Sequence, residues 1–310
     1  MTRKILITGG CGNVGGSLAR RLVSDSNNQI TIVDNLVTGS KSKLPSSKFD
    51  NWDFIHADCN DFKIMSEIMT SSSFDYVFHY AALVGVQRTL ASPIMVLDDI
   101  KGIENMLMLS KDTNVKRFFY SSSSEVYGEP VEFPQKEDTT PLNSRLPYAI
   151  VKNVGEAFVK SYSKEYGLNF SIFRFFNTYG PLQSSDFVMT KFIIQAINGD
   201  DITIYGDGMQ TRTFCYINDN LDVIESILYK NLAVNEVLNI GNNNEISMLD
   251  LAKKIIQILE SKSNIIHLPA LEEGDMTRRL PEISKMNEIL DRDLTSINDG
   301  ILMMAENYKV

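Results

Sequence analysis

The sequence contains few of the residues that build disulfide frameworks or metal sites. Of 310 residues, three are cysteine and three are histidine. The cysteines, Cys11, Cys59 and Cys215, are odd in number and far apart, and no CxxC or HExxH pattern occurs. A disulfide framework is therefore excluded, a reducing cytoplasmic setting is favoured, and we expect no protein-bound metal.

Positive charge and long apolar runs are also scarce. Thirty Lys and Arg residues face 39 Asp and Glu residues, so the net charge is −9. General binding to nucleic acid needs a basic face and is not expected, although a local arginine cluster could hold one phosphorylated small molecule. No run approaches the roughly 18 apolar residues of a membrane helix, and the N-terminus MTRKILITGG lacks the apolar core of a signal peptide. We therefore expect no membrane partner.

The first half of the chain alternates between strand-like and helix-like segments. This alternation predicts an α/β fold in which a parallel sheet carries helices on both faces. The predicted strands are 4–8, 29–35, 52–58, 74–82, 115–123 and 170–177, and the predicted helices are 13–24, 61–70, 93–112 and about 148–166.

After residue 177 the pattern loosens and predicts a smaller C-terminal lobe. We expect domains at 1–177 and 178–310, with parts of 214–240 returning to pack on the first. No linker rich in Pro or Gly separates them. Helices are predicted at 188–200, 218–230 and 247–260, the last capped by Ser247, and strands within 201–208 and 236–242.

A glycine-rich turn, TGGCGNVGG, joins the first strand to the first helix. Glycines at 9, 12 and 15 would let backbone N–H groups approach a pyrophosphate at the positive end of the helix. Asp34 ends the second strand, 22 residues after Gly12. A carboxylate there accepts from ribose hydroxyls and repels a 2′-phosphate, which favours NAD over NADP. The alternative is an Asp that only caps a turn.

Residues at the ends of two further strands are also expected to contact the dinucleotide. Asp58 ends the third strand, where an adenine could meet it, and a simple turn Asp is the alternative. Ala81 and Ala82 end the fourth strand, and their small side chains would let a dinucleotide lie close to the sheet edge.

The segment YAIVK places Tyr148 and Lys152 on one face of a predicted helix. A free phenol has a pKa of about 10. A neighbouring ammonium and a nicotinamide cation would stabilise the phenolate, so Tyr148 could act as a base near neutral pH, and Lys152 could also hold the nicotinamide ribose. When this spacing occurs without other motifs, the Tyr and the Lys are most often two exposed residues of a helix.

The segments described above together predict the cofactor contacts. These are Gly9, Gly12, Asn13, Val14, Gly15, Asp34, Asn35, Asp58, Cys59, Ala81, Ala82, Tyr148 and Lys152.

These residues give the chain a resemblance to a known family. It resembles the extended short-chain dehydrogenases/reductases, specifically the nucleotide-sugar epimerases, dehydratases and decarboxylases, over nearly its whole length. The resemblance implies a Rossmann-type doubly wound sheet, a catalytic triad of Ser123, Tyr148 and Lys152, and an Asn where this chain has Asp99. The motifs that carry it are TGGCGNVG, VDNLVTGS, HYAA, SSSSEVYG, YAIVK, RFFNTYGP, IYGDGMQTRTFCYIND, NIGNNNEIS and TRRLPEISK.

The substrate implied by the resemblance is a nucleotide-diphosphate sugar. Arginine forks match a diphosphate. By resemblance, Arg212 and one of Arg278 and Arg279 hold the diphosphate, with Arg278 preferred here, and Asn177 assists. A solvated surface residue is the ordinary alternative for a single arginine.

The implied chemistry is oxidation of a sugar carbon, most often C4, by NAD. The dTDP-glucose 4,6-dehydratases carry an Asp-Glu pair where this chain has Ser124 and Glu125, which disfavours that reaction. UDP-glucuronate decarboxylases typically carry arginines where this chain has Leu182 and Phe187, and a buried carboxylate without a cation is costly. We therefore expect an epimerase of a neutral sugar, with Glu125 near the sugar as a fourth catalytic residue that could remove a proton from C3 or C5 beside the 4-ketone.

Other outcomes remain open at this point. Within the class they are a net 4-dehydrogenase, a decarboxylase and a dehydratase. Outside it, the alternative is a non-catalytic dinucleotide-sensing module, although such proteins usually lose the Tyr or the Lys. The resemblance also implies a homodimer through helices near 93–112 and 148–166, and core packing is the alternative for their apolar residues.

Overall fold

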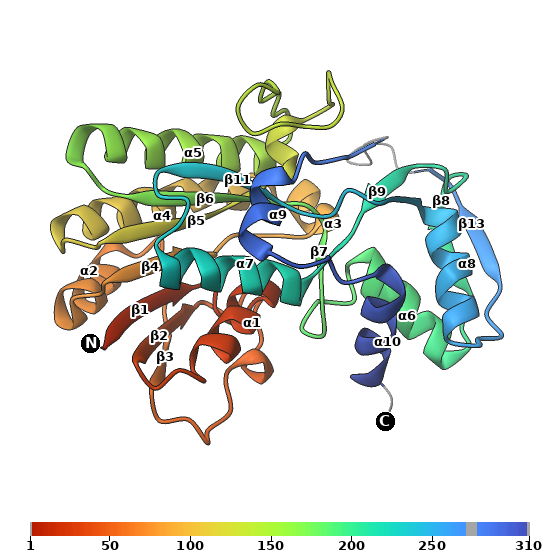
Figure 1. Ribbon diagram of the computed structural model, residues 1–310, viewed down its shortest axis with the longest axis horizontal. Helices are drawn as coiled ribbons and strands as arrows, with labels where there is room; N and C mark the ends of the chain where they lie inside the picture. Colours follow the sequence, from red (N-terminus) through yellow and green to blue (C-terminus); the bar gives the residue numbers. More distant parts are fainter. Residues whose placement is uncertain (1, 271–277, 309–310) are drawn as a thin grey trace. The chain divides into compact units, whose positions relative to one another are not determined.

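The computed structural model describes residues 2–270 and 278–308 (Figure 1). Thr277, which begins the last of the family motifs, lies outside these residues. The chain forms two compact units that interleave along the sequence. The domain boundary at residue 177 stays a prediction. The first unit comprises Met1–Gly128, Leu142–Phe175 and Glu225–Leu238, and the second comprises Glu129–Pro141, Phe176–Ile224 and Asn239–Val310.

The first unit is built on the predicted parallel sheet. Within the described residues, seven strands lie in the order β11-β6-β5-β4-β1-β2-β3. The pairs from β1 to β6 are all parallel. This order reverses at β1, as in doubly wound sheets, so the predicted fold class is confirmed. The strands are β1 (Arg3–Thr8), β2 (Asn28–Asp34), β3 (Trp52–His56), β4 (Tyr76–His79), β5 (Arg117–Ser123), β6 (Phe170–Phe175) and β11 (Glu236–Ile240).

Helices cover both faces of this sheet (Figure 1). On one face α2 packs on α4 and α4 on α5. On the other, α1 is joined to the C-terminal half of α7 by an ion pair of 2.9 Å between Arg21 and Glu225. The helices are α1 (Asn13–Leu22), α2 (Phe62–Ser72), α3 (Val86–Ala91), α4 (Pro93–Asp112), α5 (Pro147–Tyr166) and α7 (Ile217–Lys230), with 3₁₀ turns η1 (Lys41–Lys43) and η2 (Ser124–Tyr127).

Local sequence accounts for the ends of these helices. The Asp61 side chain caps α2 by accepting from the Ile64 N–H group. Pro147 opens α5, where its missing N–H costs no hydrogen bond, and Gly167 closes it in the left-handed conformation. Behind the sheet, apolar side chains of α2, α4 and α5 meet those of the strands. The core includes Leu6, Val77, Phe118 and Ile172 from strands and Met65, Ile103, Met106 and Val151 from helices.

The second unit consists of short strand pairs and packed helices. Helices α6, α8 and α10 pack on one another. Ser247 caps α8 by accepting from the Asp250 N–H group, as predicted. The pairs are β7 (Thr178–Tyr179) with β10 (Cys215–Tyr216), β8 (Ile202–Tyr205) with β13 (Ile265–Leu268), and β9 (Thr211–Thr213) with β12 (Glu245–Ser247). The helices are α6 (Val188–Asn198), α8 (Met248–Ile258), α9 (Ser284–Leu290) and α10 (Ile297–Glu306).

The cysteines, the possible metal ligands and the helix lengths bear on what the sequence composition led us to expect. Cys11, Cys59 and Cys215 are all buried and form no disulfide. Among residues 2–270 and 278–308, no cluster of three or more His, Cys, Asp or Glu side chains is arranged to hold a metal. In the same residues, no helix combines the length and the apolar character needed to cross a bilayer.

Candidate active site

The glycine-rich turn after β1 leaves no room for side chains. Gly9 has φ +69°, and its N–H group donates to the Val33 carbonyl at 2.8 Å. A Cβ atom on Gly9 would lie 2.5 Å from the backbone nitrogen of Ala81, and one on Gly15 would lie 2.5 Å from the Gly9 carbonyl oxygen. Both neighbours are backbone atoms, so the turn keeps its shape only with glycine at these positions.

Asp34 holds this turn from the end of β2. Its Oδ2 accepts from the Cys11 N–H group at 2.9 Å, and its Oδ1 accepts from the Leu36 N–H group at 2.8 Å. The side chain is buried. Each carboxylate oxygen has a second lone pair. Asp34 therefore shapes the turn and retains acceptor capacity for ribose hydroxyls.

The end of β3 is tied to the end of β2 by side chains. The Asn35 Nδ2 donates to Asp58 Oδ2 at 2.9 Å, and Asp58 Oδ1 accepts from the Asn60 N–H group at 2.8 Å. Cys59 is buried, and burial raises the pKa of its thiol to about 12. Cys59 is thus an uncharged packing residue, while Asp58 and Asn35 form a polar edge.

These residues fit a bound dinucleotide. Helix α1 begins at Asn13, and the first N–H groups of a helix have no partner within it. Asn13 also brings a buried Oδ1 atom with no hydrogen-bond partner among the described residues. The carboxyl ends of parallel strands share one edge of a sheet, so Ala81 and Ala82, after β4, lie at the same edge as the glycine turn and Asp34. The donors and acceptors at this edge suit a pyrophosphate and its riboses.

The three residues of the predicted triad come together at the end of β5. The Ser123 hydroxyl lies near enough to Tyr148 to lower the pKa of its phenol. Its Oγ atom also accepts from the Glu125 N–H group at 3.2 Å, which places Glu125 in the first turn of η2. The Lys152 Nζ donates to the Ser121 carbonyl at 2.6 Å. The spacing of Tyr148 and Lys152 on α5 therefore directs both side chains to the residues that end β5.

Burial sets the charge state of this group. It raises the pKa of the Tyr148 phenol well above its usual value, and the neighbouring Ser123 hydroxyl offsets this only in part. It lowers the pKa of Lys152 to about 8. The Lys152 Nζ lies 5.8 Å from the centre of the Tyr148 ring. A Tyr148 base near neutral pH thus depends on positive charge beside the phenol.

A buried network behind the triad was not predicted from the sequence. The Arg174 guanidinium binds both oxygens of Glu156, and its Nη1 donates to the Tyr127 hydroxyl at 2.8 Å. Ser122 Oγ donates to Glu156 Oε1 at 2.6 Å. These four residues connect β5, η2, α5 and β6, and they fix the SSSSEVYG segment that carries Ser123 and Glu125.

The predicted diphosphate residues lie in the second unit, where Arg278 forms an ion pair with Glu245. Arg278 donates to both oxygens of Glu245, from Nε at 2.7 Å and Nη2 at 2.6 Å. The Thr211 hydroxyl donates to Glu245 at 3.0 Å, and the Arg278 guanidinium lies over the Phe133 ring at 4.3 Å. Arg212 belongs to β9, and its Nη1 donates to the neighbouring Thr211 carbonyl. Glu245 is a partner that the sequence interpretation missed.

The two consecutive arginines differ in environment. The Arg278 side chain is 43% exposed, whereas Arg279 is 2% exposed. Asn177 has φ +36°, and its Nδ2 donates to the Thr213 carbonyl at 2.9 Å, so it anchors the end of β9. Of the two arginines, Arg278 is the more accessible to a ligand in this structure.

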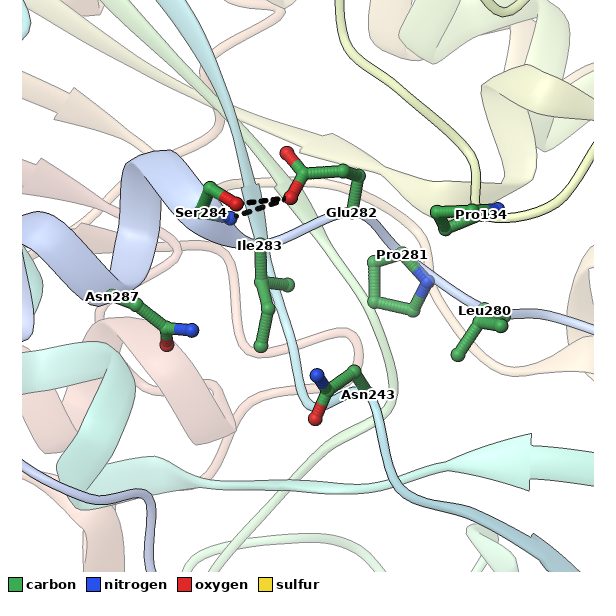
Figure 2. A pocket seen from close by; sticks show the side chains of 8 residues that line it. All are labelled: Pro134, Asn243, Leu280, Pro281, Glu282, Ile283, Ser284 and Asn287. Atoms are coloured by element: carbon green, nitrogen blue, oxygen red, sulfur yellow. Dashed lines mark hydrogen bonds between the residues drawn. The ribbon is translucent and has the colours of Figure 1, made fainter.

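The second unit also contains an open pocket of about 260 Å³ (Figure 2). Pro134, Pro281, Asn243 and Asn287 are among its lining residues, and the Ser284 N–H and hydroxyl groups bond to Glu282 beside it. None of the residues predicted to bind substrate lines this pocket. It is therefore separate from the candidate diphosphate contacts.

Comparison with known proteins defines the class of enzyme. Residues 5–241 match the model of the NAD dependent epimerase/dehydratase family. The chain therefore belongs to this family of NAD-dependent enzymes of the extended short-chain dehydrogenase/reductase type, and its cofactor is NAD. The recognition made from the sequence motifs is confirmed.

Individual relatives differ in the reaction they are named for. The chain is 35% identical to UDP-N-acetyl-alpha-D-glucosaminuronate decarboxylase of Bacillus cytotoxicus, over 93% of this chain and 92% of that protein. It is 33% identical to UDP-glucuronic acid decarboxylase 1 of Danio rerio, over 93% of this chain and 68% of that protein. Among solved structures, UDP-glucose 4-epimerase of Thermotoga maritima with UDP-glucose is similar, with a TM-score of 0.92, 28% identity and 98% of each chain covered.

Proposed function

We propose that this protein is a nucleotide-sugar epimerase that acts through oxidation of a neutral sugar at C4. The observation that carries the proposal is the grouping of Ser123, Tyr148 and Lys152 at the end of β5, on the sheet edge that also bears the glycine turn. This grouping provides a proton acceptor beside a dinucleotide site, as oxidation of a secondary alcohol requires.

In the proposed reaction each side chain has a separate role. Tyr148 accepts the proton of the sugar hydroxyl, and Ser123 orients the phenol and the hydroxyl by hydrogen bonds. Lys152 contributes the positive charge that makes the phenolate accessible. NAD supplies the hydride acceptor, and after reduction the hydride donor, when it is bound. With NAD bound, C4 would be inverted if the hydride returned to the opposite face of the ketone while Tyr148 gave its proton back to the ketone oxygen.

The substrate contacts are proposed from the second unit. Arg212 and Arg278 would bind the diphosphate, with help from Asn177, because guanidinium groups pair with phosphate oxygens in two-point contacts. The relatives named above act on UDP-sugars, and we propose a nucleotide of this kind here. When it binds phosphate, the Arg278 guanidinium would either keep its ion pair with Glu245 or break it.

The preference for a neutral sugar rests on two positions. Leu182 and Phe187 stand where the resemblance to the decarboxylases leads us to expect arginine. Leu182 is half-buried and Phe187 is the residue before α6. Neither can neutralise a sugar carboxylate, and an unpaired carboxylate taken out of water is unfavourable. This supports an epimerase over a decarboxylase.

A decarboxylase of a nucleotide-linked uronic acid is the second candidate. It is favoured by the relatives at 33–35% identity, which are named as decarboxylases. Both candidates share the 4-keto sugar, so they differ only in what happens to it. The fate of the sugar carbon skeleton therefore separates them.

Product mass tests the proposal directly. The purified protein is incubated with NAD and a panel of UDP-, GDP- and dTDP-sugars, neutral and acidic, and each product is analysed by mass spectrometry and NMR. Unchanged mass with inverted C4 supports the epimerase. Loss of CO₂ from an acidic sugar would establish the decarboxylase instead, and loss of water or of two hydrogens would establish a dehydratase or a dehydrogenase. The Tyr148→Phe variant serves as the inactive control.

We also propose that the protein forms a homodimer through α4 and α5. Ile94 is 72% exposed and Met95 46% exposed at the start of α4, and Leu97 and Ile150 add exposed apolar surface on the two helices. Apolar residues gathered on neighbouring helices are typical of a subunit interface. Light scattering tests this, with a monomeric mass counting against it and Ile94→Asp expected to shift a dimer toward monomer.

A further inference from the structure

Arg20, an exposed residue of α1, is bound to the backbone of the loop that follows β2. Its Nη2 donates to the Ser42 carbonyl at 2.6 Å, and its Nε donates to the carbonyls of Lys43 at 3.0 Å and Leu44 at 3.2 Å. The last carbonyl groups of a helical turn have no partner within it, and these three stand at the end of η1. One guanidinium therefore closes the C-terminal end of η1 with charge-assisted hydrogen bonds.

The start of η1 is tied to the glycine-rich turn. The Ser40 N–H group donates to the Cys11 carbonyl at 3.0 Å. The Ser40 hydroxyl oxygen also caps η1, because it accepts from the Ser42 N–H group. The short turn is therefore held at both ends, by the glycine-rich turn at Ser40 and by Arg20 at its last carbonyls.

Gly39, the residue before Ser40, lies directly against the Asp34 carboxylate. A Cβ atom on Gly39 would lie 2.6 Å from Asp34 Oδ1 and 2.8 Å from the Cys11 Cβ atom. The same Oδ1 accepts from the Leu36 N–H group, and Oδ2 accepts from the Cys11 N–H group. The loop that carries η1 therefore orients Asp34, and its position decides where the remaining lone pairs of the carboxylate point.

The next residue of α1 has a different partner. Arg21 Nη1 forms an ion pair of 2.9 Å with Glu225 of α7. Both arginines lie in the last turn of α1, where a cation interacts favourably with the negative end of the helix dipole. Arg20 and Arg21 thus carry the same charge on the same helical turn and differ in what they bind, so Arg21 offers a matched comparison.

We propose that Arg20 is a positioning residue for NAD: by closing the end of η1 it holds Gly39 against Asp34, and so sets the Asp34 carboxylate to accept from the hydroxyl groups of the adenosine ribose. Arg20 itself need not touch the cofactor. Because both ends of η1 are bound beforehand, less order has to be imposed on the loop when NAD binds. The inference takes NAD from the family and the ribose contact of Asp34 from the sequence prediction, and it is independent of the reaction proposed for the sugar.

The test compares two ligands in three proteins. NAD, and the NAD analogue that lacks the 2′-hydroxyl of its adenosine ribose, are titrated by calorimetry into the unmodified protein, Arg20→Met and Arg21→Met. Methionine keeps a long side chain with high helix propensity and removes the charge and the donors. The ratio of the two affinities measures how strongly the protein binds that hydroxyl, and for a charged acceptor it should be at least about tenfold. A partly unfolded variant binds both ligands less and leaves this ratio unchanged.

In Arg20→Met we expect NAD affinity to fall by about fivefold and the affinity ratio to narrow to about threefold, because groups in one hydrogen-bond network are energetically coupled. In Arg21→Met both quantities should stay within about twofold of the unmodified protein. A second variant, Gly39→Ala, pushes the loop away from Asp34 Oδ1 by direct contact. It should narrow the ratio in the same way as Arg20→Met.

An unchanged ratio in Arg20→Met would overturn the inference, even if stability or NAD affinity fell, because Arg20 would then only stabilise the fold. Equal narrowing in Arg20→Met and Arg21→Met would also overturn it, since a general loosening of α1 would then be the cause. A ratio near one in the unmodified protein would do the same, because the hydroxyl would not be bound by Asp34. These titrations use no sugar, so a protein that epimerises no sugar would overturn the proposed function and leave this inference standing.

Discussion

Arg174 and Glu156 form a two-point ion pair inside the first unit, with Nε to Oε1 at 2.8 Å and Nη2 to Oε2 at 2.7 Å. Both side chains are almost fully buried. Ser122 and Tyr127 complete the hydrogen bonding of the pair, so its charges are compensated without water. A pair of this kind fixes the position of η2 relative to α5, and therefore of Glu125 relative to Tyr148.

Removing one partner should destabilise the protein strongly. Arg174→Met leaves the Glu156 carboxylate buried beside a single hydroxyl donor from Ser122 and the exposed Lys160. Breaking a buried pair in this way costs about 3–5 kcal/mol. We expect a loss of that size in the free energy of unfolding, measured by urea denaturation followed by circular dichroism.

The matched control is Lys160→Met, which removes the other cation near Glu156. Lys160 is 46% exposed and its Nζ lies 3.3 Å from Glu156 Oε2. An exposed pair contributes at most about 1 kcal/mol. If both variants lost the same small amount of stability, the Arg174 pair would not be the element that holds η2 and α5 together.

The same pair predicts a pH dependence of stability. Hydrogen bonds and charge from Arg174 hold the pKa of Glu156 below its ordinary value of 4.5, even though burial acts the other way. A depressed pKa contributes stability that is complete above the unfolded-state pKa and is lost as the pH falls through the folded-state pKa. The stability difference between the unmodified protein and Glu156→Gln should therefore shrink as the pH is lowered from about 5 to about 3. Urea unfolding midpoints at several pH values measure it, and a constant difference over that range contradicts the assignment.

The sheet could be predicted from local sequence, and so could the placement of Tyr148 and Lys152 beside the end of β5, whose catalytic role stays a prediction. Glycines between a strand and a helix, and a Tyr and a Lys four residues apart on one helix, are short patterns whose geometry the backbone dictates. The helix cap at Ser247 was predicted for the same reason. In these segments local preference and tertiary structure agree.

The network around Glu156 could not be predicted because it depends on tertiary packing. Glu156 lies on the same helix as Lys152, and nothing in its neighbours indicates that it is buried. Its partner Arg174 is 18 residues away, on a strand. Strands β7, β9 and β10 have only two or three residues each, too few for an alternating pattern to emerge. The pairing of Glu245 with Arg278 likewise joins residues 33 apart.

Cofactor binding should be lost when a side chain enters the glycine turn. In Gly9→Ala the new Cβ atom would lie 2.5 Å from the Ala81 nitrogen, so the turn has to move. We expect NAD affinity to fall by at least about tenfold, equivalent to about 1.4 kcal/mol, as measured by isothermal titration calorimetry.

Gly167→Ala is the control for backbone strain. Gly167 has φ +73°, close to the +69° of Gly9, but among the described residues no atom beyond its own chain neighbours lies within 4 Å of a Cβ built on it. This variant should lose about 1 kcal/mol of stability for the left-handed conformation and keep its NAD affinity. Equal NAD affinities for the two variants would show that the turn tolerates a side chain and does not lie against the cofactor.

The final prediction distinguishes Tyr148, the phenol proposed as the catalytic base, from a buried phenol nearby. Tyr148→Phe removes the proposed proton acceptor and its interaction with the Ser123 hydroxyl. General base catalysis contributes about 10²–10⁴-fold to rate, so kcat should fall by about that factor. NAD affinity should change little, since the ring remains.

Tyr120→Phe is the matched control, because the Tyr120 hydroxyl is buried and has no hydrogen-bond partner among the described residues. Its kcat should stay within about twofold of the unmodified protein, as expected for a group that takes no part in the reaction. Both rates are measured with the sugar nucleotide that the product-mass panel identifies. An equal loss of kcat in the two variants would mean that packing around Lys152, rather than proton transfer by Tyr148, limits the rate.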